Sequence, residues 1–149
     1  MVANTRSARE WVTQWQAKRS HTAAELRTKL ERKDFTVAEI EDAATWAAQY
    51  AGQNDAEVAT HTAQTRKQQR FGQARIVAEL EARGITAATA ERVTQTTASD
   101  EQQRADVALQ TQVTRFTGEP HKAAAWLSRR GFDEDAVRRA VEKWIGALE

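Results

Sequence analysis

Apolar residues along this chain recur at the three- and four-residue spacing of amphipathic helices. The segment 21–50 contains two such helices, and Leu26 and Leu30 lie one turn apart in the first of them. Thr22 and Thr36 each stand three residues before a glutamate, which is the pattern of a capping box at a helix start. We expect the second helix to bury one face, formed by Ile40, Ala43, Ala44, Ala47 and Tyr50.

The same two-helix unit occurs twice more along the chain. The segments 74–93 and 123–141 place apolar residues at matching offsets: Ile76, Leu80, Ile85 and Ala90 in one, and Ala123, Leu127, Phe132 and Val137 in the other. The apolar residues that follow the turns, Phe35, Ile85 and Phe132, are 50 and 47 residues apart. A period of this length is typical of a helical repeat. We expect the leucines that recur in the first helix of each unit to be core residues: Leu30, Leu80 and Leu127.

The turns between the paired helices carry matching residues. Gly84 and Gly131 follow the first helix of their units, where a left-handed residue closes the last turn, and Asp34 takes that place in the first copy. Thr36, Thr86 and Asp133 can then cap the next helix. A cation precedes each turn and complements the helix dipole: Lys33, Arg83 and Arg130.

Further helices complete the pattern. One is expected at about 54–69, and a matching one begins near residue 99. The sequence therefore predicts an all-α fold of three tandem three-helix repeats in an elongated, curved array. The expected division is an N-terminal capping helix at 1–20, followed by repeats at 21–70, 71–117 and 118–149.

Composition narrows the class of protein further. The 149 residues contain no cysteine, which excludes disulfides and thiolate sites, and only one proline and six glycines, too few for an all-β sandwich or barrel. No apolar run approaches the roughly 18 residues of a membrane span, and the N-terminus lacks the apolar core of a secretory signal. We expect a cytoplasmic protein.

The residue types that carry catalysis are present without a catalytic arrangement. His21, His61 and His121 are far apart and have no second ligand at metal spacing, and the carboxylates lie on polar helix faces. Neither a glycine-rich phosphate loop nor a nucleophile motif occurs. We therefore expect no enzymatic activity, no metal and no cofactor.

Charge is balanced overall but divided locally. The net charge is +1, yet residues 36–62 carry five acidic and no basic side chains, whereas residues 63–84 carry five basic and two acidic ones. Basic residues also recur at one end of each unit, where they suit either the helix dipole or an anionic ligand. The candidate contact residues are Arg66, Lys67, Arg70, Arg75, Arg32, Lys33, Arg83, Arg129 and Arg130.

Three segments in this order and at this spacing resemble the RecX family, the bacterial regulators of the RecA recombinase. They are HTAAELRTKLERKDFTVAEI, NDAEVATHTAQTRKQQRFGQARIVAELEARGI and AAAWLSRRGFDEDAVRRAV. The resemblance extends from about residue 16 to residue 146.

The resemblance implies a partner and an effect. It implies that the protein lies in the helical groove of the RecA–single-stranded DNA filament and reduces ATP hydrolysis, strand exchange and co-protease activity. We expect Arg66, Arg70, Arg75 and the Arg129–Arg130 pair to contact acidic RecA surface or DNA phosphates, and the protein to be monomeric.

Two other interpretations fit the same residues. The stretch ELEARGITAATAERV has a helix–turn–helix layout with Gly84 in the turn, so a module that binds duplex DNA alone is one alternative. The other is a helical-repeat scaffold for an unrelated protein.

Overall fold

The computed structural model describes residues 5–148, and this part of the chain contains nine α-helices and no strand. The expected all-α class is confirmed. The helices are α1 (Ala8–Lys18), α2 (Ala23–Arg32), α3 (Val37–Tyr50), α4 (Asp55–Gln68), α5 (Gln73–Ala82), α6 (Ala87–Thr94), α7 (Ala98–Gln110), α8 (Pro120–Arg129) and α9 (Glu134–Leu148).

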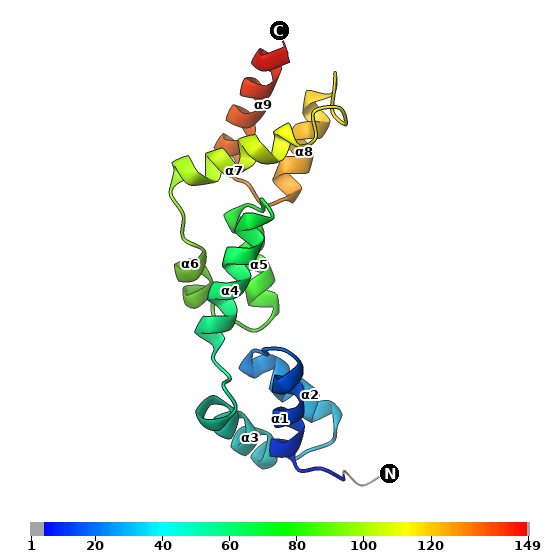
Figure 1. Ribbon diagram of the computed structural model, residues 1–149, viewed down its shortest axis with the longest axis vertical. Coiled ribbons are helices and arrows are strands. Elements are labelled where there is room, and N and C mark those ends of the chain that lie inside the picture. Colours follow the sequence, from blue (N-terminus) through cyan, green and yellow to red (C-terminus); the bar gives the residue numbers. More distant parts are fainter. Residues whose placement is uncertain (1–4, 149) are drawn as a thin grey trace.

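Buried apolar residues form three clusters, one for each consecutive group of three helices. We call these groups the first unit (α1–α3), the second unit (α4–α6) and the third unit (α7–α9). They follow one another along the long axis of an elongated molecule (Figure 1). The clusters thus break between α3 and α4 and between α6 and α7. The repeat division expected from the sequence, at 20, 70 and 117, stays a prediction; its residues 1–4 and 149 lie outside the described part.

The helix starts follow the capping signals of the sequence. Thr22 and Thr36 both form complete capping boxes, and Asn54 caps α4. The Asp133 carboxylate accepts the backbone N–H of Ala136 at 2.8 Å and so caps α9. Each cap satisfies an N–H that the helix itself leaves unpaired.

The core leucines lie where the periodicity put them, with one correction for α3. Leu30, Leu80 and Leu127 are fully buried. Tyr50, however, is 68% exposed, although we expected it on the buried face. Ten residues at about 100° each turn it about 80° away from Ile40, so it lies at the edge of that face. Its ring contacts Trp46 instead.

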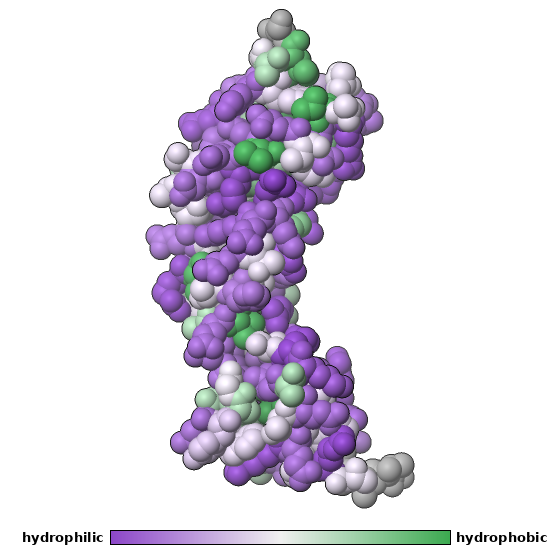
Figure 2. Space-filling view, in the orientation of Figure 1, coloured by the Kyte–Doolittle hydropathy of each residue, from purple (hydrophilic) through white to green (hydrophobic). Residues whose placement is uncertain are grey.

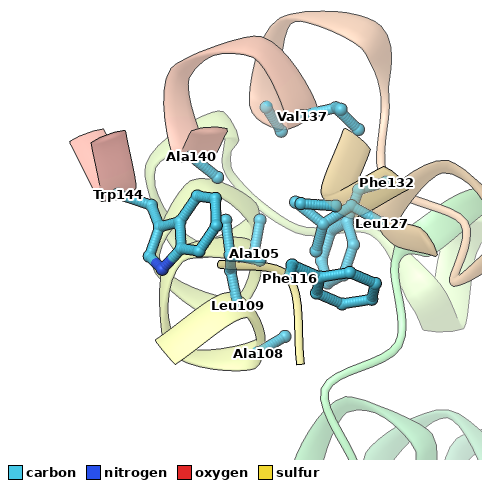
Figure 3. Packing of buried hydrophobic residues seen from close by; sticks show 11 residues of the cluster. Ala105, Ala108, Leu109, Phe116, Leu127, Phe132, Val137, Ala140 and Trp144 are labelled. Carbon is cyan, nitrogen blue, oxygen red and sulfur yellow. The ribbon is translucent and has the colours of Figure 1, made fainter. Parts of the chain in front are cut away.

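Aromatic residues fill the third unit. Trp144 of α9 lies beside Ala105 and Leu109 of α7, while Phe116 and Phe132 pack near Leu127 (Figure 3). The chain leaves α7 at Gln110 and turns, which buries Phe116. Large side chains such as Trp144 thus pack against small ones such as Ala105 in this cluster.

Successive units are joined through the turn before the last helix of each. In the second unit this turn lies against α2, and the Thr22 hydroxyl donates to the Arg83 carbonyl oxygen at 2.6 Å. In the third unit it lies against the start of α5, and the Gly72 N–H donates to the Arg130 carbonyl oxygen at 2.8 Å. We call these contacts the first and second junctions.

Both junctions need glycine at the turn. Gly84 and Gly131 have φ of +87° and +93°, and a Cβ on either would overlap the Cβ of Ala24 or Arg75. Asp34 holds the equivalent turn of the first unit at φ +64°, where its side chain is exposed. All three turn residues have a positive φ, but only at Gly84 and Gly131 does a neighbouring helix also leave no room for a Cβ. This close approach is why two of the turns need glycine and the third tolerates aspartate.

A carboxylate from the following unit also caps a helix at each junction. Asp55 accepts the backbone N–H of Ala23, the first residue of α2, at 2.9 Å. Glu101 accepts the N–H of Gln73, the first residue of α5, at 3.1 Å. The corresponding residue of α8 is Pro120, which has no N–H to satisfy.

The surface is polar. On the face shown in Figure 2, hydrophilic residues cover most of the molecule and apolar residues form small, separate patches. Within residues 5–148, no helix combines the length and apolar character that crossing a membrane would need.

The leucine column gives a first test. Leu80→Ala should lower the free energy of unfolding by about 2–5 kcal/mol, because the side chain is fully buried and leaves a cavity. Denaturant unfolding measures the change. Val37→Ala is the control, because Val37 is 78% exposed, and it should change stability by less than about 0.5 kcal/mol.

The junction glycines give a second test. Gly84→Asp should destabilise the protein by about 2–4 kcal/mol, because strain at positive φ adds to the overlap with Ala24. Asp34→Gly, the reciprocal exchange at the exposed turn, should change stability by less than about 1 kcal/mol. Equal effects in thermal or denaturant unfolding would contradict the role assigned to the close approach.

Candidate basic interface

Phe71 lies in the short link between α4 and α5, with two arginines against its ring. The guanidinium carbons of Arg130 and Arg75 lie 4.1 Å and 4.5 Å from the ring centroid. Cations at this distance are attracted by the negative face of an aromatic ring. The ring thus holds together two positive groups from different units.

Hydrogen bonds fix these arginines to the second junction. The Arg130 Nε donates to the Arg70 carbonyl oxygen at 3.1 Å. The Arg75 Nη1 donates to the Arg129 carbonyl oxygen, also at 3.1 Å. The ends of α4 and α8 and the start of α5 therefore bring four arginines to one place. We call Arg70, Arg75, Arg129 and Arg130 the basic cluster.

No side chain of the basic cluster forms an ion pair or a hydrogen bond with a carboxylate within residues 5–148, although the charge of Arg75 also acts on Glu79, which is paired with Arg66. Partial burial, together with the charges of Arg75 and Arg70, lowers the pKa of Arg130. Arg70, Arg75 and Arg129 are exposed. Concentrated positive charge that is only partly balanced inside the chain attracts anionic groups from outside, such as a carboxylate surface or a phosphate.

Arg66, predicted with this group, has a partner inside the chain. Its guanidinium forms an ion pair with Glu79 of α5 at 2.7 Å and also donates to Gln69. The hydrogen bond from Arg66 lowers the pKa of Glu79, and the pKa of Arg66 is raised in turn. Arg66 therefore adds less net charge to this surface than the basic cluster does.

Arg83 is likewise neutralised, at the first junction. It forms an ion pair with Glu25 of α2 at 3.0 Å and donates to the Thr62 hydroxyl at 3.2 Å. This side chain therefore joins three helices from two units.

The remaining predicted residues lie elsewhere. Lys33 approaches the Trp11 ring at 4.2 Å, and Arg32 lines a groove of about 400 Å³ between α2 and the first junction. Lys67 donates to the Gln95 carbonyl oxygen at 3.2 Å, on the side of α6 and α7. Burial and the nearby Arg104 lower the pKa of Lys67. The nine candidates thus form one cluster of four and several separate positions.

Sequence reasoning did not single out Phe71 and Arg104. Phe71 organises the basic cluster, and its only signal was an aromatic residue between Arg70 and Gly72. Arg104 is half-buried, its Nη1 donates to Thr96, and its Nε and Nη2 have no hydrogen-bond partner among the residues that the structure describes. No spacing rule distinguishes it from other helical arginines.

His21 is buried inside the fold, where its ring lies between Arg19 and Lys29. It is 1% exposed, its Nδ1 lies 2.9 Å from the Arg19 carbonyl oxygen, and its Nε2 lies 3.1 Å from Lys29 Nζ. Burial, Arg19 and Lys29 lower the pKa of His21. Across residues 5–148, no group of three or more His, Cys, Asp or Glu side chains is placed to hold a metal ion.

Comparison with solved structures identifies the architecture. RecX from Lactobacillus salivarius superposes with a TM-score of 0.80 at 17% identity, over 92% of this chain and 94% of that protein. The chain has the RecX fold. A second structure, of a regulatory protein RecX, gives a TM-score of 0.80 at 16% identity, over 91% of this chain and 71% of that one. No protein-family model matches the sequence, and no curated protein is significantly similar to it. The RecX-like fold expected from the motifs is thus confirmed, at low sequence identity.

The Glu25–Arg83 pair predicts a pH dependence. Partial burial acts to raise the pKa of Glu25, but hydrogen bonds from Arg83 and from the Thr22 N–H outweigh it and lower the pKa. A lowered pKa stabilises the fold above the unfolded pKa of about 4.3, and this contribution is lost as pH falls through the folded value.

Glu25→Gln should therefore destabilise the protein at neutral pH, and its difference from wild type should shrink below about pH 4. Glutamine keeps the capping-box hydrogen bond, so the change isolates the charge. Glu31→Gln, at an exposed position without a side-chain partner in the described chain, is the control. Urea unfolding across pH measures both, and a difference that stays constant with pH would contradict the assignment.

Proposed function

We propose that this protein regulates a RecA recombinase, mainly as a negative modulator. It binds in the groove of the RecA–single-stranded DNA filament and limits ATP hydrolysis, strand exchange and co-protease activity. The observation that carries the proposal is the RecX fold over nine-tenths of the chain. The basic cluster supports it as a surface for phosphates or for acidic protein.

The shape and the charge distribution suit such a groove. The molecule is elongated, with the first unit and the third unit at its opposite ends (Figure 1). A ligand made of protein and DNA presents both signs of charge, and a near-neutral protein with local charged surfaces can complement both. In this proposal the protein is cytoplasmic and monomeric, and it acts by binding, without a cofactor.

The helix–turn–helix alternative places α5 and α6 in that motif, and the exposed face of α6 carries Glu91 beside Arg92. It predicts tight, strongly salt-dependent binding to duplex DNA without RecA. The scaffold alternative predicts no response to RecA filaments.

Charge reversal in the basic cluster tests the proposal. Arg70→Glu combined with Arg129→Glu should weaken binding to preformed RecA–single-stranded DNA filaments by about tenfold or more at low salt. The effect should shrink as salt is added, because screening weakens exposed charges. Neither side chain has a partner within the described chain, so the helical circular dichroism signal should not change.

Lys18→Glu combined with Arg139→Glu makes the same charge change elsewhere and is the control. Naked single-stranded and duplex DNA in the same salt complete the comparison. Equal weakening by both double variants would contradict the cluster assignment. Binding of wild type to naked DNA alone, or to none of these ligands, would contradict the regulator proposal.

A further inference from the structure

A groove of about 960 Å³ lies on the second unit, at its boundary with the third. α5 and α6 form its walls, and the start of α7 and the turn at Gly131 close one end. None of the nine predicted contact residues lines it. The groove therefore shares no lining residue with the basic cluster.

The groove is acidic. Four carboxylates line it, from Glu81, Glu91, Glu101 and Asp133, against a single guanidinium, from Arg92. Glu101 caps α5 and Asp133 caps α9, so these two are held in place by backbone N–H groups. Glu81 and Glu91 are exposed and have no side-chain partner in the described chain. Two carboxylates at the rim thus remain available to a cation from outside.

Small apolar residues line the groove between the charges. Val77 is half-buried, and Ala74, Ala78 and Ala88 are exposed. Because these side chains are short, the backbone of a bound segment can approach closely and its apolar side chains can lie between α5 and α6. Glu101 and Asp133 are engaged as helix caps at one end of the groove. Glu81 and Glu91 at the rim therefore set which ligand charge the groove prefers.

These features select one class of ligand. The two exposed rim carboxylates of Glu81 and Glu91 repel nucleic-acid phosphates, whereas Glu101 is buried and faces Arg104 and Lys67, so this surface does not suit DNA. The rim carboxylates complement lysine and arginine, and the alanine-lined centre complements apolar side chains. We propose that the groove docks a basic amphipathic segment of a protein partner. The identity of this partner as the recombinase rests on the function proposed above. The preference of the groove for a basic segment does not depend on that function.

A peptide pair tests the groove chemistry without the recombinase. The probes are a short amphipathic helical peptide of leucine and lysine and its leucine–glutamate counterpart. The basic peptide should bind, and Glu81→Lys combined with Glu91→Lys should weaken it by about tenfold. Both glutamates lie near helix C-termini, where lysine is favourable, so the variant should fold. Glu31→Lys combined with Glu142→Lys, at exposed positions outside the groove and away from helix N-termini, is the matched control.

A photo-crosslinker then identifies the partner. p-Benzoylphenylalanine replaces Ala88 in the groove or, as the control, the exposed Ala38 of α3. In the presence of RecA–single-stranded DNA filaments, position 88 should crosslink to a lysine- and arginine-rich segment of RecA, and position 38 should not.

Each outcome decides one part of the proposal. Equal affinity of wild type and the groove variant for the basic peptide, or equal binding of the acidic peptide, overturns the groove assignment. A crosslink from position 88 to DNA or to a second copy of this chain overturns the partner class. Retained peptide selectivity without any filament binding would refute the regulator function and leave the groove chemistry standing.

Discussion

The structure depends on how one unit docks on the next. Each junction places the turn of a following unit against the start of a helix in the unit before it, through a backbone carbonyl of Arg83 or Arg130. The approach is close enough to exclude any side chain at Gly84 and Gly131. Each hydrophobic cluster is small, and neighbouring units bury the ends of helices that would otherwise face water.

The junctions also satisfy backbone groups that a single unit leaves unpaired. The first N–H groups of α2 and α5 find their acceptors on the following unit, at Asp55 and Glu101. Pro120 has no such N–H, so α8 needs no acceptor at that position. The first N–H of a helix is thus satisfied by a carboxylate of the following unit in α2 and α5, whereas proline removes that N–H in α8.

The arginines at the two junctions have different electrostatic consequences. Arg83 meets Glu25, and the pair is internally neutral. Arg130 meets Phe71, Arg70 and Arg75, and the positive charge remains available. The acidic groove lies on the same second unit, between α5 and α6. A chain with a net charge of +1 therefore presents surfaces of both signs, which supports a partner that is itself part protein and part nucleic acid.

The sequence by itself determined the helices, their caps, the leucine column and the turn residues. All of these depend on contacts within a few residues, where spacing and residue type fix the geometry. The RecX-like architecture followed from three such segments in order. Only the tertiary structure decided that Glu79 neutralises Arg66 and that Phe71 gathers arginines from two units. The net charge of a surface depends on which groups come into contact across 13 to 61 residues of sequence, and local periodicity contains no information about those contacts.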